Sequence, residues 1–319
     1  MFTSSSRLLR SWRMRISALH EYVEEKADKI DLCVADFPKR HFNNFKSVSD
    51  FKTQCQVSQV VDLSAGSPSA KKFYRKLKES ERRIRKYELS YRVSHSDTDF
   101  EIFYYKMYVP HAQKQHGKYS VKLAYKQMEE VFKDGYLLLV IQAGIAIAGQ
   151  LFSLRDGILS TFRMGILNGD RSYVEMGAIS ALYYFTVEYA NSAFRFNRLD
   201  CGESLSFPDD GVFLNKREMG ATVYPDNDSE SWIFIFNPNQ SDKISYVFES
   251  NPIIVHTDTG LMVLVGVPDM NELMVEERDR LKQKYHSPGI KGMILLKKNA
   301  DTSKILFFDD PDNSRTIEG

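Results

Sequence analysis

The sequence has little cysteine, and its cysteines are not spaced for a shared role. Cys33, Cys55 and Cys201 are the three among 319 residues, and no CxxC pair is present. An odd, widely spaced set forms neither a disulfide framework nor a zinc site. The seven histidines are scattered as well. We therefore expect no metal centre, and we expect a cytoplasmic protein in a reducing compartment.

An excess of charge of either sign is also lacking. The 43 Lys and Arg residues stand against 42 Asp and Glu, which leaves a formal charge of +1. This balance excludes a histone-like binder and an acidic solvating chain. It does not exclude a local patch of charge of one sign. Aromatic residues make up 13% of the chain. That much aromatic surface excludes disorder over most of the chain.

Several common catalytic signatures are absent. The sequence has no GxxxxGK[ST] loop, no GxGxxG after a predicted strand, no HExxH and no GxSxG. These patterns mark phosphate loops, dinucleotide-binding folds, zinc proteases and serine hydrolases, respectively. The sequence therefore gives no support to any of those four classes.

One uncharged run is as long as a membrane span. Residues 135–154 carry no charge over twenty positions. The run contains three glycines and two glutamines and has a turn signal at Ala143-Gly144, which is typical of two strands joined by a tight turn. We predict a β-hairpin there and expect no membrane span. Residues 1–17 carry four arginines, but no long apolar run follows them, which disfavours a secretory signal.

Positive charge is concentrated between residues 71 and 92. This stretch holds ten basic and three acidic residues. Phe73, Leu77, Ile84 and Tyr87 recur at helical spacing, which predicts a basic amphipathic helix. Two interpretations stay open. The charges form either a solvated face or a docking surface for phosphate groups or RNA, with a tRNA or a carrier protein as candidate partner.

The rest of the pattern predicts alternating helices and strands. Asp156-Gly157 is a strong hairpin signal between two of the strands. The predicted helices are 97–116, which Pro110 is expected to kink or shorten, 120–133, 177–193 and a short one at 213–220. The predicted strands are 91–94, 136–142, 145–154, 158–166 and 196–200, followed by a loop at 201–204. Beyond residue 250 the pattern predicts strands at 252–256, 261–267, 290–297 and 304–308, and a helix at 270–285.

This order of elements, with several short motifs, resembles the Fem-type and BioF-like branch of the GNAT superfamily of acyltransferases. The resemblance runs from about Val61 to Val223. The matching segments are Val61-Asp62-Leu63-Ser64, Arg82-Arg83-Ile84-Arg85-Lys86, Phe103-Tyr104-Tyr105, Leu138-Leu139-Val140 with the segment from Gly144 to Gly149, Leu199-Asp200-Cys201-Gly202-Glu203-Ser204, and the segment from Val212 to Gly220.

The resemblance implies an α+β fold with a GNAT-like mixed, largely antiparallel central sheet flanked by helices. It implies an acyltransferase that forms an amide between an acyl donor and a small or peptide-like amine acceptor. Acyl-CoA, an acyl-carrier protein and an aminoacyl-tRNA are the candidate donors, and no permanently bound cofactor is expected. The alternative is a non-catalytic module of the same fold that binds RNA or a protein partner.

The donor's phosphates would bind at a helix N-terminus, where backbone N–H groups favour anions. Gly177, Ala178 and Ile179 begin that helix, and Arg171 lies nearby. The superfamily's [Q/R]-x-x-G-x-[G/A] loop is incomplete here, because Arg171 lies six residues before Gly177 rather than three. Lys216 and Arg217 match the family's basic position, which could contact a donor phosphate or an acceptor carboxylate.

The resemblance also implies which residues contact the donor carbonyl, the attacking amine and the acceptor. The strand that contains Gly165 would supply a backbone N–H to the carbonyl oxygen of the donor, and Gly165 would mark a bulge. Asp200 and Glu203 would receive the proton of the attacking amine, with Glu203 as the preferred base. Tyr104 and Tyr108 would line the acceptor site, although tyrosines at this helical spacing are more often core residues.

We expect domain boundaries at residues 66 and 250, so that the resembling region lies in the middle part of the chain. We predict an N-terminal segment at 1–66, an acyltransferase domain at 67–250 and a β-rich extension at 251–319. The two terminal segments are candidates for a second, partial GNAT-like half.

Overall fold

The computed structural model describes residues 18–47, 49–117, 122–237, 243–267, 275–297, 302–308 and 314–318. The chain divides into two compact units. Unit 1 comprises Met1–Ser58, Glu203–Asn215 and Val223–Gly319, and unit 2 comprises Gln59–Gly202 and Lys216–Thr222. The predicted boundaries at residues 66 and 250, and the predicted second GNAT-like half, stay predictions.

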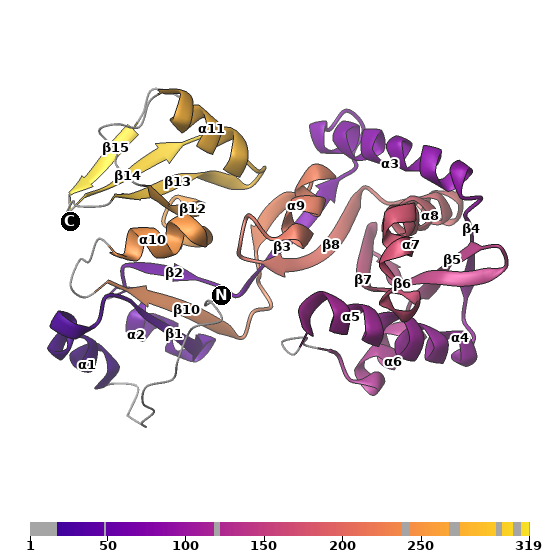
Figure 1. Cartoon of the computed structure of the whole chain (residues 1–319), viewed down its shortest axis with the longest axis horizontal. Coiled ribbons are helices and arrows are strands. Elements are labelled where there is room, and N and C mark those ends of the chain that lie inside the picture. Colours follow the sequence, from indigo (N-terminus) through magenta and orange to yellow (C-terminus); the bar gives the residue numbers. More distant parts are fainter. Residues whose placement is uncertain are drawn as a thin grey trace. The chain divides into compact units, whose positions relative to one another are not determined.

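The largest sheet has seven strands in the order β4-β5-β6-β7-β8-β3-β9 (Figure 1). Its strands are β4 (Ser90–Ser94), β5 (Tyr136–Gln142), β6 (Ile145–Arg155), β7 (Ile158–Ile166), β8 (Arg198–Leu205), β3 (Gln56–Asp62) and β9 (Thr222–Pro225). The first four pair antiparallel, and β7 pairs with β8 in parallel. The predicted fold class, a mixed and largely antiparallel sheet flanked by helices, is confirmed.

The uncharged run at 135–154 forms β5 and most of β6, so the predicted hairpin is confirmed. Ala143 and Gly144 both have positive φ at its turn, as a type I′ turn requires. In the part of the chain that the structure describes, no helix has the length and apolar character needed to cross a membrane.

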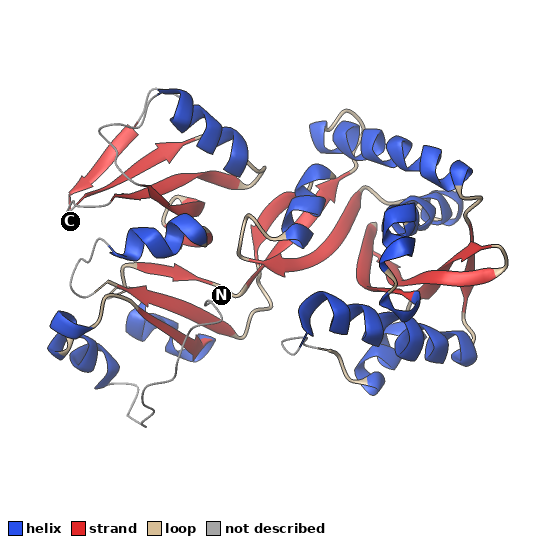
Figure 2. Ribbon diagram, viewed as in Figure 1, coloured by secondary structure: helices blue, strands red, loops and turns tan. Residues whose placement is uncertain are grey.

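Two helical layers cover the sheet of unit 2 (Figure 2). Leu138 and Val140 of β5 pack into one core with α3 (Pro68–Lys86) and α8 (Ala178–Ala193). Leu137 and Leu139 pack into the opposite core. That second core includes side chains of α4 (Asp97–Ile102), the π-helical segment η4 (Phe103–Tyr108), α5 (Val109–His116) and α6 (Tyr125–Lys133). Because successive strand residues point to opposite faces, one apolar run supplies both cores.

The predicted helix at 97–116 is continuous, and Pro110 does not end it. Pro110 lies in the first turn of α5, directly after η4. A proline cannot donate an i→i−4 hydrogen bond, and the wider π-turn precedes it in the chain. Tyr125 begins α6, whereas Ser120, the predicted first residue of that helix, lies outside the described residues.

Two glycines let η4 approach the sheet closely. Gly149 of β6 and Gly165 of β7 are directly opposite each other in the ladder. A Cβ added at Gly165 would lie 2.4 Å from the backbone nitrogen of Tyr108, and one at Gly149 would lie 2.7 Å from the Phe103 ring. The absence of both side chains is therefore a packing requirement.

Unit 1 has two further sheets. One has the order β1-β10-β2, and the other has the order β11-β12-β13-β14-β15. The strands are β1 (Cys33–Pro38), β10 (Ser231–Phe236), β2 (Phe51–Thr53), β11 (Ile253–Thr257), β12 (Gly260–Val267), β13 (Ile290–Lys297), β14 (Thr302–Phe307) and β15 (Ser314–Glu318). The helices of this unit include α1 (Leu19–Glu25), α2 (Phe42–Phe45), α10 (Lys243–Ser250) and α11 (Val275–Tyr285). The four strands predicted beyond residue 250 are present within one or two residues.

We expect Gly165→Ala to destabilise the protein by about 1–3 kcal/mol, because the new methyl group overlaps the backbone of η4. Thermal or urea unfolding measures the change. Gly211→Ala is the matched control, since a Cβ at Gly211 meets nothing within 4 Å. Equal stability of the two variants would contradict the packing role of Gly165.

His256 on β11 makes unit 1 sensitive to acid. Burial, with a smaller contribution from Lys52, lowers the pKa of His256 from 6.5 to about 4, and its ring lies edge-on to Trp232 at 4.6 Å. The unfolded chain therefore binds this proton more tightly than the folded one. The contribution is complete above pH 6.5 and is lost as the pH falls towards 4.

We expect His256→Asn to reduce the loss of stability between neutral pH and about pH 4 by up to about 3 kcal/mol. Urea unfolding of both proteins across this range measures the difference, and other titrating groups cancel in the comparison. Parallel stability curves for the two proteins would contradict the account.

Candidate functional site

Strands β7 and β8 separate within the sheet, and we call this separation the fork. Ile158, Leu159 and Ser160 pair in parallel with Arg198, Leu199 and Asp200. Among the described residues of unit 2, the pairing ends at Ser160 and Asp200. Beyond that point the edge of β7 that faces β8 has left the ladder, so its peptide groups are placed differently from those of a continuous sheet.

An irregularity in β7 accompanies the fork. The register between β6 and β7 shifts where Gln150 pairs with Met164 and Phe152 pairs with Thr161. Phe162 and Arg163 together therefore face Leu151, which is a β-bulge. The prediction that Gly165 marks the bulge is wrong, because Gly165 pairs regularly with Gly149. Its function as a backbone donor stays a prediction.

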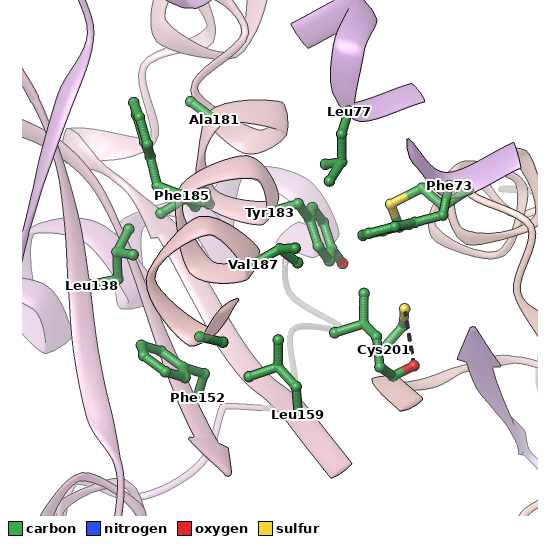
Figure 3. Close-up of a cluster of buried hydrophobic side chains, with 14 of the residues drawn as sticks. Phe73, Leu77, Leu138, Phe152, Leu159, Ala181, Tyr183, Phe185, Val187 and Cys201 are labelled. Carbon is green, nitrogen blue, oxygen red and sulfur yellow. Dashed lines mark hydrogen bonds between the residues drawn. The ribbon is translucent and has the colours of Figure 1, made fainter. Parts of the chain in front are cut away.

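Side chains reinforce the last paired position before the fork. The Thr161 hydroxyl donates to the carbonyl oxygen of Asp200 at 3.1 Å. Tyr183 of α8 hydrogen-bonds to Thr161, and burial raises the pKa of Tyr183 far above its ordinary value. The Tyr183 phenol is therefore neutral, and its contact with Thr161 connects α8 to the start of the fork. Figure 3 shows Tyr183 in the same cluster as Leu159 and Cys201.

Strand β8 continues past the point where the sequence predicted a loop. The predicted loop at 201–204 is wrong, since β8 extends to Leu205. Gly202 has φ of +72°, and its N–H donates to Oδ1 of Asp200 at 2.8 Å. The buried positions of β8 are Leu199, Cys201 and Ser204, so the alternation shifts by one residue at Gly202. Asp200 and Glu203 consequently fall on the same, more exposed face of β8.

Lys216 is the buried cation near this strand. Its side chain is 4% exposed, and its Nζ donates to the carbonyl oxygen of Gly202 at 3.0 Å. Lys216 follows Phe213 on α9 (Gly211–Glu218), which confirms the predicted short helix. The neighbouring Arg217 accepts a hydrogen bond at its carbonyl oxygen from Lys72. Contacts of Lys216 and Arg217 with a donor phosphate stay predictions.

Cys201 is not poised to act as a nucleophile. Burial raises the pKa of its thiol to about 12, and the nearby charge of Lys216 lowers it by less than burial raises it. The thiol is therefore protonated at neutral pH, whereas nucleophilic attack requires the thiolate.

The predicted phosphate site lies at a junction of two helices. A helix that the sequence analysis missed, α7 (Arg171–Met176), precedes α8 and is separated from it by Gly177 at φ +98°. The N–H of Gly177 donates to Val174 at 2.9 Å, Ala178 is fully buried, and Ile179 is partly buried. Arg171 is exposed and pairs with Glu175. Donor binding by these residues stays a prediction.

The hydroxyls of Tyr104 and Tyr108 form hydrogen bonds with the backbone of Leu123. Both are buried. The Tyr104 hydroxyl donates to the carbonyl oxygen of Leu123 at 2.9 Å, and the N–H of Leu123 donates to the Tyr108 hydroxyl at 3.0 Å. They belong to the core on the α5–α6 side of the sheet. Their contact with an acceptor stays a prediction.

Sequence reasoning missed the Thr161–Tyr183 pair. Tyr183 lies on the apolar face of its helix and Thr161 alternates with apolar residues along a strand, so neither differs in pattern from a core residue. The pair becomes visible only in the structure, where Thr161 directly follows the paired segment of β7 and bonds to the carbonyl oxygen of Asp200, the last paired residue of β8. Among the described residues, no group of three or more His, Cys, Asp or Glu side chains is placed to hold a metal ion.

Comparisons with known proteins give remote structural likenesses. No protein-family model and no curated protein matches the sequence. Similar solved structures include the C-terminal domain of a putative lysylphosphatidylglycerol synthetase from Agrobacterium fabrum, at 12% identity and a TM-score of 0.40 over 68% of this chain and 71% of that one.

Two further structures are similar, one with the same TM-score and one with a lower TM-score. FemX matches at 13% identity and a TM-score of 0.40, over 70% of this chain and 77% of its own. A GCN5-related N-acetyltransferase from Kribbella flavida matches at 14% identity and a TM-score of 0.28, over 63% and 66%. At these values the likenesses carry no conclusion about activity.

We expect Thr161→Val and Tyr183→Phe each to destabilise the protein by about 1–3 kcal/mol, because each leaves a buried polar group without its partner. The double variant should cost less than the sum of the two single variants, since both act on one hydrogen-bonded chain. Urea unfolding of the four proteins measures this coupling. Strict additivity would show that the two residues act independently.

Proposed function

We propose that the protein is a cytoplasmic N-acyltransferase that forms an amide between an acyl donor and an amine acceptor at the fork. The observation that supports this most is the end of β7–β8 pairing at Ser160 and Asp200. Parting strands present peptide groups at a fixed geometry inside the sheet, and such preorganised N–H groups stabilise a developing oxyanion. The resemblance of the sequence to the Fem-type and BioF-like branch of GNAT enzymes supports the same assignment.

The proposed reaction needs one carbonyl contact and one proton acceptor. The amine nitrogen attacks the donor carbonyl carbon, and the bond from that carbon to the thiol or hydroxyl leaving group breaks. A peptide N–H of β7, with Gly165 as the candidate, holds the carbonyl oxygen. Asp200 and Glu203, which share a face of β8, bind the amine and take its proton, and the leaving group is then protonated.

The candidate acyl donors are proposed because they carry negatively charged phosphates. Acyl-CoA, an acyl-carrier protein and an aminoacyl-tRNA all carry phosphates, and Arg171, Lys216 and Arg217 are the candidate contacts with Gly177, Ala178 and Ile179. The acceptor is a small or peptide-like amine, with Tyr104 and Tyr108 as candidate contacts. These assignments follow the resemblance, and the buried position of Lys216 favours a positioning function over a direct contact with phosphate.

A second function has its own supporting observation. The N–H of Gly177 is already used by Val174, and Ala178 is fully buried, so this turn offers less to a phosphate than an open helix N-terminus. A non-catalytic module that binds RNA or a protein partner would not need that site.

We expect Asp200→Asn and Glu203→Gln to lower kcat about 100- to 10,000-fold while the KM of the donor changes little, because proton transfer is lost and donor binding is kept. Release of free coenzyme A from a panel of acyl-CoAs, with a mixture of amino acids and small amines as acceptors, measures the rate. Deacylation of bulk aminoacyl-tRNA is followed in parallel.

Glu188→Gln is the matched control, since Glu188 is an exposed carboxylate on α8 of unit 2. Its rate should equal that of the unaltered protein. Full activity in both site variants would overturn the assignment of the carboxylates. An absence of transfer from every donor would favour the binding module.

A further inference from the structure

The outer face of α3 forms a basic groove with α7. The groove has a volume of about 720 Å³ and is open to solvent. Its lining, which we call the α3 groove, belongs entirely to unit 2 and consists of Arg75, Lys78, Glu79, Arg82, Arg83, Lys86, Tyr87 and Glu175. The opposite face of α3 is buried through Ala70, Phe73 and Leu77, so the helix is fixed by its apolar side and presents its charged side.

Helix α3 differs in extent from the predicted basic segment at 71–92. The helix ends at Lys86, whereas Arg92 lies on β4 and pairs with Asp99. Even so, α3 holds nine basic and two acidic residues, so the charge lies on the helix itself.

The two acidic residues of the α3 groove form no ion pair with the basic residues of its lining. Its two acids pair with cations outside the lining, Glu79 with Lys76 at 3.9 Å and Glu175 with Arg171 at 3.2 Å. Among the residues that the structure describes, Arg75, Lys78, Arg82 and Arg83 form no ion pair. The surface therefore concentrates cations whose charge is available to a partner.

The arrangement of these cations suits a chain of phosphates. From Arg75 to Lys86 the stripe runs along about 16 Å of helix at 1.5 Å per residue, which is longer than one phosphate or pyrophosphate group. Three of the five cations are arginines, whose planar forks bind phosphate oxygens in pairs. Tyr87 adds a half-buried aromatic ring to the lining. One side of the residue packs against the core of unit 2, and Lys86 lies 4.9 Å from the ring centroid.

We propose that the α3 groove binds a single-stranded segment of RNA, with the cations on successive phosphates and Tyr87 as a stacking surface for a base. An open basic groove that contains an aromatic ring is the general design of single-strand binding surfaces. An acidic protein would use the cations but not the ring. The inference goes beyond the proposed acyl transfer, because RNA would bind here whether or not the fork is catalytic.

The test is fluorescence anisotropy of the full-length protein with a labelled RNA of about 12 nucleotides and mixed sequence. Four phosphate contacts predict an affinity that falls about 50-fold between roughly 50 mM and 200 mM salt. Arg75→Ala combined with Arg82→Ala should weaken binding at least about 10-fold at low salt and reduce the fall to about 7-fold. Tyr87→Leu should weaken binding while leaving the salt dependence unchanged.

The matched control is Lys71→Ala combined with Arg85→Ala. Both residues are exposed on α3 outside the groove lining, so this variant removes the same number of charges from the same helix. It should retain RNA affinity within about twofold. Equal weakening in both double variants would overturn a groove-specific site. Binding to vesicles of anionic phospholipid, or to an acidic carrier protein, in place of RNA would overturn the choice of partner.

Discussion

The parting of β7 and β8 after Ser160 and Asp200 is the constraint on which the account of the site depends. A parallel pair that stops after three residues leaves backbone groups inside a sheet that would otherwise be satisfied by the ladder, and buried peptide groups are costly to leave unpaired. Side chains bond to the backbone carbonyls at and just beyond the last paired position. Thr161 reaches the Asp200 carbonyl, Tyr183 supports Thr161, and Lys216 reaches the Gly202 carbonyl.

The same region combines rigidity on one side with openness on the other. Gly149 of β6 and Gly165 of β7 let η4 pack directly against these two strands. Strand β7 is therefore fixed by close contact with the backbone of η4. The face of β8 that carries Asp200 and Glu203 is the more exposed one. Groups fixed by packing and carboxylates open to a substrate are the two conditions that acyl transfer by positioning requires.

Much of the fold follows from pattern, and the exceptions have physical reasons. The hairpin at 135–154 was predictable because β-rich apolar runs flank a positive-φ turn, and the alternation along β5 already encodes two cores. Two features were not predictable. Strand β8 continues through Gly202 where the sequence predicted a loop, and α7 precedes Gly177 where no helix was predicted. Of the candidate site, the sequence indicated Asp200 and Glu203. Their common face depends on the shift in alternation at Gly202, and Thr161 is recognised only from strand pairing.

Hydrogen exchange with and without a bound donor tests the central claim most directly. An acyl-CoA or aminoacyl-tRNA that supports transfer is added at saturation, and exchange is followed by mass spectrometry for peptides that cover β7 and β8. The account predicts slower exchange in residues 161–166 and 201–205, while the paired start of the two strands changes little. Protection confined to other segments, with the fork unchanged, would show that the separation of β7 and β8 is not where the donor binds.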